Sequence, residues 1–233
     1  MVDCGSSFRS PTGLEFVKMR NIVYSMSGAE PMRSRKETLI DRLLLLYTVD
    51  QGNKHGFVDG PFKLQKLPFA AELKMSAERE KGFNYTFFRY THGPISTEVY
   101  EDRDALQAAG FMGYAGGLIR LTQKGQDLLQ SVNPVLKKNE RILSRIDCAA
   151  KKYAALSFGE LKVVIYQLKV RWAGRTVTVA DIPSCVNILT KFSENQSKTQ
   201  FKLSDDWLDS LWGIFDYTED DWEKLNTVRR AAS

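Results

Sequence analysis

Histidine and cysteine are scarce in this chain of 233 residues, which holds only two histidines and three cysteines. Zinc hydrolases and His-based nucleophilic enzymes depend on imidazole groups, so the scarcity of histidine argues against both classes. The number of cysteines is odd, and they lie far apart in the sequence, at Cys4, Cys148 and Cys185. No Cys-x-x-Cys motif occurs. We therefore expect neither a metal site nor a redox pair, and a reducing cytoplasm is the simplest setting.

Long apolar runs are missing as well. The longest, Leu43 to Leu46, is far too short to span a bilayer, and no basic start followed by an apolar block marks a secretory signal. A composition of 43% hydrophobic and 26% charged residues is ordinary for a globular protein. Because no catalytic constellation is visible either, we expect a protein that is not an enzyme, binds no cofactor and has no membrane partner.

The net charge of +5 is unevenly distributed along the chain. Residues 1–130 hold 17 basic and 15 acidic side chains, residues 131–190 hold 10 and 4, and residues 191–233 hold 6 and 9. The basic excess therefore lies in the middle of the chain, where it would attract phosphate groups or an acidic protein.

The order of sequence patterns predicts a mainly α fold with a small β component. Residues 1–34 mix Gly, Ser, Pro and Arg and are expected to form a weakly ordered tail. Residues 35–131 are expected to form a winged-helix-like unit, and residues 132–233 a helical C-terminal unit. The expected elements of the first unit are helices over residues 37–50, 61–75 and 96–109, an aromatic strand over residues 83–90 and a glycine-rich hairpin over residues 113–120. Pro68 is expected to kink the second helix or to shift its start.

The C-terminal unit is expected to contain several helices. The spacing of apolar residues predicts one long helix over residues 135–156. Ser157 and Glu160 form a capping box that opens another helix, which is expected to end near Trp172. A short strand is expected over residues 176–179, and a helix or turn over residues 181–192. Two more helices are expected to begin after Ser204 and Thr218, because acidic residues follow each of these caps.

Several motifs in residues 37–130 occur in an order that resembles a known family. They are Lys63-Leu-Gln-Lys-Leu67 followed by Phe69 and Ala70, the aromatic run Phe83–Tyr90, Gly93-Pro94, Tyr100, Leu106–Phe111 and Leu121–Gly125. The combination resembles the YwgA-like and Panacea-type (SocA-like antitoxin) proteins, over about half of the chain. Pro68 and His92 depart from the family pattern. The resemblance implies a small non-enzymatic domain that contacts other proteins, as an antitoxin or an adaptor.

The helix before the wing enters the major groove in winged-helix proteins that read DNA. Here that helix spans residues 96–109 and carries Glu98, Glu101, Asp102 and Asp104 against a single Arg103. Phosphates would repel such a helix, because DNA affinity depends on Lys and Arg. We therefore expect this helix either to contact a protein partner, through Glu98, Glu101 and Asp102, or to present a plain solvated face.

A better basic surface follows the wing. Lys138, Arg141, Arg145 and Lys152 are spaced by 3, 4 and 7 residues and would share one face of the helix over residues 135–156. This face is expected to be a solvated side of an amphipathic helix, or else a contact for phosphate groups or for an acidic partner. Lys63 and Lys66 are expected to be exposed charges on their own helix.

All four tryptophans lie in the last third of the chain, and Trp207 and Trp212 lie in a segment rich in acidic residues. Such residues either fill a core or anchor a protein interface. We expect a cytoplasmic, non-catalytic protein-interaction module, antitoxin- or adaptor-like, whose partner is a protein such as a toxin. The alternative is a winged-helix DNA-binding regulator that uses the basic helix after the wing.

Overall fold

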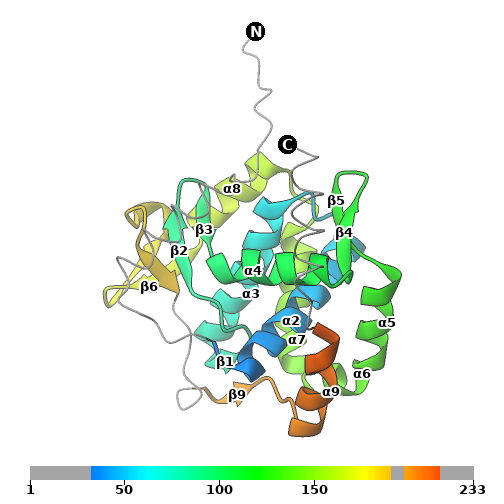
Figure 1. Ribbon diagram of the computed structural model, residues 1–233. Helices are drawn as coiled ribbons and strands as arrows, with labels where there is room; N and C mark the ends of the chain where they lie inside the picture. Colours follow the sequence, from blue (N-terminus) through cyan, green and yellow to red (C-terminus); the bar gives the residue numbers. More distant parts are fainter. Residues whose placement is uncertain (1–32, 190–196, 216–233) are drawn as a thin grey trace. The chain divides into compact units, whose positions relative to one another are not determined.

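Most of the protein is helical and its strands are short in the computed structural model, which describes residues 33–189 and 197–215 (Figure 1). The helices are α2 (Arg35–His55), α3 (Pro61–Ala77), α4 (Thr97–Ala108), α5 (Gln123–Ser131), α6 (Asn133–Lys138), α7 (Glu140–Tyr153), α8 (Phe158–Gln167) and α9 (Asp205–Phe215). The strands are β1 (Glu80–Lys81), β2 (Phe87–Tyr90), β3 (Gly93–Ile95), β4 (Met112–Ala115), β5 (Leu118–Leu121), β6 (Lys169–Trp172), β7 (Arg175–Thr178), β8 (Asn187–Leu189) and β9 (Thr199–Gln200). The prediction of a mainly α fold with a small β component is confirmed.

Helix α2 begins at a capping box. The Ser34 hydroxyl accepts a hydrogen bond from the backbone of Glu37 at 3.2 Å, and the Glu37 carboxylate accepts one from the backbone of Ser34 at 2.8 Å. The helix packs against α3, α4, α7 and α9, and ten of its 21 residues are buried. The expected tail over residues 1–34 lies outside the described residues, except for Arg33 and Ser34, which already belong to the fold.

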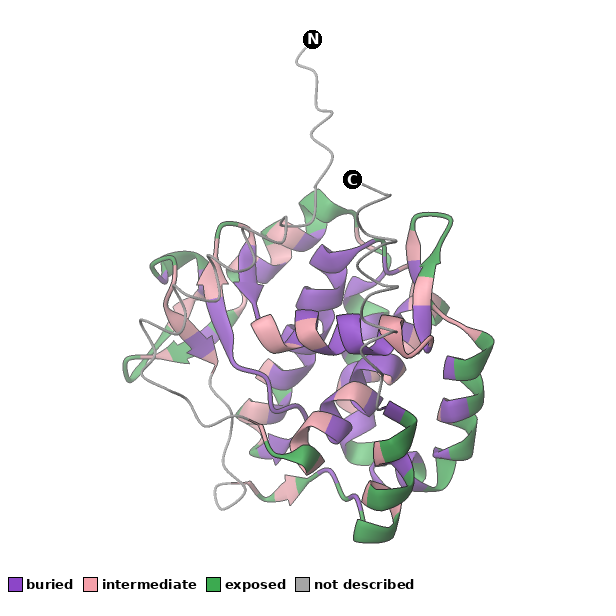
Figure 2. Ribbon diagram, viewed as in Figure 1, coloured by how far each residue is buried: buried purple, intermediate pink, exposed green. Residues whose placement is uncertain are grey.

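Helix α3 has more buried residues than any other helix in the described residues, since every residue from 61 to 72 is buried. Pro61 lies in its first turn, where a missing N–H costs nothing. The helix continues through Pro68 to Ala77, so Pro68 does not shift its start. Figure 2 shows α2 and α3 as mainly buried, whereas α5 and α9 expose one side.

The strands form small sheets that join distant parts of the chain. Strand β2 pairs with β3 on one side and with β8 on the other, both antiparallel. Strand β1 pairs in parallel with β9, while β4–β5 and β6–β7 are hairpins. The aromatic run predicted as a strand over residues 83–90 is a strand only from Phe87 onward.

The second half of the chain differs from the expectation in three places. The long helix over residues 135–156 is divided at Asn139 into α6 and α7. Helix α8 opens at the predicted capping box but ends at Gln167, where β6 takes over. Residues 181–192 were expected to form a helix or turn, and their described part contains a turn at residues 184–185 followed by the unexpected strand β8. The helix after Ser204 is confirmed as α9, whereas the one expected after Thr218 lies outside the described residues.

The expected boundary at residues 131–132 does not separate two cores in the described residues. Helix α7 packs against both α2 and α3, and β8 completes the sheet of β2 and β3. Ile142 and Ile146 of α7 belong to the same apolar cluster as Leu43 and Leu67. Residues on both sides of the boundary therefore form one core, because α7 covers the faces that α2 and α3 leave apolar.

The order of α2, α3, the β2–β3 hairpin, α4 and the β4–β5 hairpin agrees with the expected order of elements. The winged-helix fold itself stays a prediction. None of the helices in the described ranges combines the length and the apolar character that crossing a bilayer requires.

Candidate functional site: a basic cleft

The acidic residue at the centre of α4 does not lie on the surface. The Asp102 side chain is 1% exposed and forms ion pairs with Arg33 at 2.6 Å and with Arg42 at 3.2 Å. The Tyr85 hydroxyl donates a hydrogen bond to the same carboxylate at 3.0 Å. Asp102 thus links α4 to α2 and is not available to a partner in this structure.

The remaining acidic residues of α4 do not form a continuous exposed face either. Asp104 is buried and accepts hydrogen bonds from its neighbour Arg103. Glu98 is half-buried and accepts hydrogen bonds from Ser96 and from Thr97, while Glu101 is half-buried. The solvated acidic face expected for this helix is therefore reduced to its half-buried glutamates, and their contact with a partner stays a prediction.

Both tryptophans proposed as anchors lie on α9 and are half-buried. The guanidinium of Arg35 lies 4.4 Å from the centre of the Trp212 ring, and Trp207 packs against the apolar core. Both rings contribute to the packing of α9, and their role as interface anchors stays a prediction.

The four cations expected on one helical face are divided between two helices. Lys138 is exposed at the end of α6, whereas Arg141, Arg145 and Lys152 lie on α7. Glu80 of β1, whose side chain is 0% exposed, forms ion pairs with both Arg141 and Arg145. These pairs hold the pKa of Glu80 below its ordinary value, Arg145 having the larger effect. Two of the four expected phosphate contacts are therefore already occupied.

Lys63 and Lys66 are buried, contrary to the expectation that they are exposed charges. The Lys63 amine donates a hydrogen bond to the Ala154 carbonyl at 2.9 Å, and the Lys66 amine donates one to the Pro94 carbonyl at 2.6 Å. Burial, followed by the nearby charge of Arg89, lowers the pKa of Lys66 to about 7. The two lysines hold α3 against its neighbours and lie outside any exposed surface.

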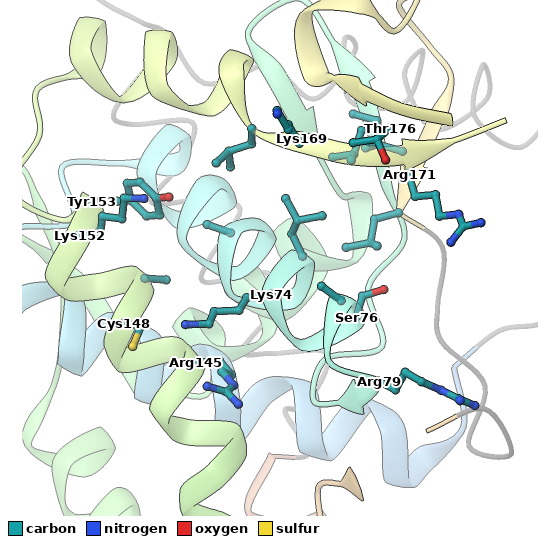
Figure 3. A pocket seen from close by; sticks show the side chains of 18 residues that line it. Lys74, Ser76, Arg79, Arg145, Cys148, Lys152, Tyr153, Lys169, Arg171 and Thr176 are labelled. Atoms are coloured by element: carbon teal, nitrogen blue, oxygen red, sulfur yellow. The ribbon is translucent and has the colours of Figure 1, made fainter. Parts of the chain in front are cut away.

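A cleft of about 720 Å³ opens between α3, α7 and the β6–β7 hairpin (Figure 3). Its volume falls within the range typical of ligand sites. The Lys74 side chain extends from α3 toward α7, where Arg145 and Cys148 lie, while Arg171 and Thr176 project from the hairpin. The cleft therefore has three walls that come from distant parts of the sequence.

Cationic side chains occur on each of these walls. They are Lys74 and Arg79 at the end of α3, Arg145 and Lys152 on α7, and Lys169 and Arg171 on β6. None of the lining residues in the described part of the chain is acidic. Six cations that line one concave surface reinforce one another's field, and such a field concentrates anions.

The cations of the cleft differ in how far they are neutralised. Arg145 is paired with Glu78 and Glu80. By contrast, Lys74, Lys169 and Arg171 form no salt bridge within residues 33–189 and 197–215, and all are exposed. These unneutralised cations are the strongest attraction that the cleft offers to an anion.

The floor of the cleft is apolar. Leu73, Ala149, Leu168, Val170 and Ile188 contribute to it. Neighbouring polar groups are the hydroxyls of Ser76, Thr176 and Tyr153 and the exposed thiol of Cys148. Within the described residues, no hydrogen bond connects this thiol to a basic side chain. Because the cleft combines cations with apolar side chains, it has the features of a binding site.

Comparison with known proteins gave no match: no family model fits the sequence, and no curated protein and no solved structure is similar to it. The role of the cleft therefore has to follow from its residues.

Sequence reasoning identified two of the six cations of the cleft, Arg145 and Lys152. It missed the other four, Lys74, Arg79, Lys169 and Arg171. One signal was present in Lys169-Val170-Arg171, because alternation in a strand places both cations on the face opposite the buried valine. The expected helix over these residues concealed it.

Proposed function

We propose that this protein is a non-catalytic, cytoplasmic interaction module that binds an acidic segment of a partner protein in its basic cleft. The observation that carries the proposal is that six cations from three walls line one cleft, with no acidic residue among the lining residues described. An acidic segment would neutralise these cations, which line one cleft without an acidic residue among them.

The apolar floor favours a protein over a nucleic acid. Leu73, Val170 and Ile188 line the cleft together with the cations and give it an apolar component. A phosphate backbone gains little from such a floor, since its affinity comes from cations alone. The resemblance to the Panacea-type antitoxins also supports a protein partner, of which a toxin is one kind.

The alternative, a DNA-binding regulator, depends on the basic helix after the wing. Its weak point is that Glu78 and Glu80 already neutralise Arg141 and Arg145. Only Lys138 and Lys152 of the expected set remain exposed without an ion pair in the described residues. Such a surface would contact few phosphates, so it supports weak and salt-sensitive binding at most.

Fluorescence anisotropy with defined probes tests the proposal. The probes are a glutamate-rich peptide with interspersed leucines, a peptide of glutamate alone, and a generic DNA duplex, each at about 50 mM and about 200 mM salt. We expect the leucine-containing peptide to bind most tightly, because it uses both the cations and the apolar floor. Tighter binding of the duplex would instead favour the DNA-binding alternative.

Charge reversal locates the binding site. Lys169→Glu combined with Arg171→Glu should weaken peptide binding about tenfold or more, because both cations line the cleft without an ion pair among the described residues. The matched control is Lys137→Glu combined with Lys138→Glu, which changes the net charge equally on exposed residues that do not line the cleft. Equal losses in both pairs would refute the cleft as the site.

Cys148 supplies a direct measure of occupancy, because its thiol is exposed within the cleft. In a variant whose other cysteines, Cys4 and Cys185, are replaced by serine, bound peptide should slow the alkylation of Cys148 by a maleimide. If saturating peptide left this rate unchanged, the peptide would be bound elsewhere and the proposal would fail.

A further inference from the structure

Arg145 lies where the cleft meets β1 and is shared between two carboxylates. Its Nε donates to Glu80 Oε2 at 2.8 Å, and its Nη2 donates to Glu80 Oε1 at 3.0 Å. The same Nη2 also forms an ion pair with Glu78. The guanidinium is 17% exposed, and it lines the cleft. The cation is therefore held at the cleft in a state that is already neutralised.

The two carboxylates that hold Arg145 differ in their environment. Glu80 is 0% exposed and is also paired with Arg141, so it is fixed between two guanidinium groups. Glu78 is 37% exposed, and Arg145 is its only ion-pair partner among the described residues. Water can replace the contacts of Glu78 at low cost, since exposed ion pairs contribute little to stability. Glu78 is thus the carboxylate that can be displaced.

We propose that Glu78 sets the specificity of the cleft by competing with the ligand's acidic group for Arg145. This inference rests on the proposed function, since it concerns how the same cleft selects its partner. A ligand carboxylate that pairs with Nη2 of Arg145 competes there with Glu78. A ligand that cannot replace this contact does not bind Arg145 and contacts only the other cations of the cleft.

The competition has a physical consequence for selectivity. Arg145 and Arg141 carry two positive charges, and Glu78 and Glu80 carry two negative charges, so this end of the cleft is neutral in the free protein. A weakly charged ligand gains little there. A ligand whose carboxylate can accept two hydrogen bonds from the guanidinium of Arg145 gains a charged, hydrogen-bonded contact in place of Glu78.

The variant Glu78→Gln tests the inference, because it removes the competing charge and keeps the size of the side chain. We expect it to raise the affinity for the glutamate-rich peptide about three- to tenfold. The matched control is Asp127→Asn, which removes one charge from an exposed residue of α5 that does not line the cleft. It should change the affinity by less than about twofold.

A double-mutant cycle separates direct competition from a general gain in positive charge. In an Arg145→Gln background, Glu78→Gln should no longer raise the affinity, because the contact that is contested has gone. A gain that persists in this background, or an equal gain from Asp127→Asn, would overturn the inference. Circular dichroism and thermal unfolding of each variant verify that the fold is retained.

The outcomes also distinguish this inference from the proposed function. If the wild-type protein binds the peptide and the charge-reversed cleft does not, the proposed function holds. If Glu78→Gln then fails to strengthen binding, the competition alone is refuted. If neither the wild-type protein nor Glu78→Gln binds any acidic peptide, both are refuted.

Discussion

At the scale of single residues, the protein is characterised by charges in its interior. Arg33 pairs with Asp41 at 2.8 Å and with Asp102 at 2.6 Å, and all three side chains are at most 10% exposed. Burial is the largest influence on Asp41 and raises its pKa to about 7, even though Arg33 lowers it. The arginine therefore balances two carboxylates that would otherwise repel each other between α2 and α4.

Glu72 is buried on α3 and accepts a hydrogen bond from the backbone of Phe83 at 3.0 Å. Burial raises the pKa of Glu72 from 4.5 to about 8. The folded state therefore holds this proton more tightly than the unfolded state does, and the stability that this provides is lost as the pH rises from about 4.5 to about 8.

Glu72→Gln should remove this pH dependence, because glutamine is neutral and can still accept the hydrogen bond from Phe83. At pH values near 9 we expect the free energy of unfolding to rise by up to about 5 kcal/mol relative to the wild type, since each unit of pKa shift is worth about 1.4 kcal/mol. At about pH 5 the two proteins should differ little. Urea unfolding at several pH values measures the difference, with exposed Glu140→Gln as the control. A constant difference across this range would contradict the prediction.

These buried charges were not predictable from the sequence. Lys63, Lys66 and Asp102 lie in segments whose local pattern fits a solvated face as well as an interior one. Their burial depends on partners that come from distant residues, such as Arg33 and the carbonyl of Pro94. Local spacing reports which side chains share a helix face, and it says nothing of what covers that face.

At the scale of helices and strands, local signals were reliable where the chain forms its own contacts. The capping box at Ser157 and the glycine-rich hairpin of β4 and β5 are both present, because each depends only on nearby residues. Strand β8 was missed, since its three residues form a strand only by pairing with β2, about a hundred residues earlier in the chain.

Asn139 divides the expected long helix by binding three backbone groups. Its amide donates to the carbonyls of Val135 at 2.8 Å and of Lys202 at 3.0 Å, and its oxygen accepts from the backbone of Lys202 at 2.6 Å. The side chain is buried. It therefore ends α6 and fixes the segment that leads into α9.

Asn139→Ala should lower the free energy of unfolding by about 1–3 kcal/mol, because it leaves buried backbone groups of Val135 and Lys202 without their hydrogen bonds. Chemical unfolding monitored by tryptophan fluorescence measures the loss, and Trp207 of α9 is a suitable reporter. Exposed Asn133→Ala, at the start of α6, is the matched control and should cost less than about 0.5 kcal/mol. A similar cost for both variants would show that Asn139 does not hold this junction.

At the scale of the whole molecule, the order of sequence patterns suggested two units, but the described residues share a core. Local patterns predict the helices of each half, and they do not report that α7 packs against α2 and α3. The same assembly builds the cleft. The sequence predicted that Arg145 and Lys152 share one helix. Lys74 and Arg171 come from α3 and β6, and they line the same cleft only in the folded protein.

The shared core predicts that residues 35–131 do not fold alone. Without α7 this fragment would expose the faces of α2 and α3 that α7 covers, and the Tyr47 hydroxyl would lose its hydrogen bond to Asp147. We expect the isolated fragment to show no cooperative thermal transition, whereas the full chain unfolds cooperatively. Adding a fragment of residues 132–215 should restore cooperative unfolding, because it supplies α7 and β8. The opposite result would be cooperative unfolding of residues 35–131 alone, at the same midpoint as a separate transition of the full chain. In that case the two-unit organisation expected from the sequence would be correct, and the shared core would contribute little to stability.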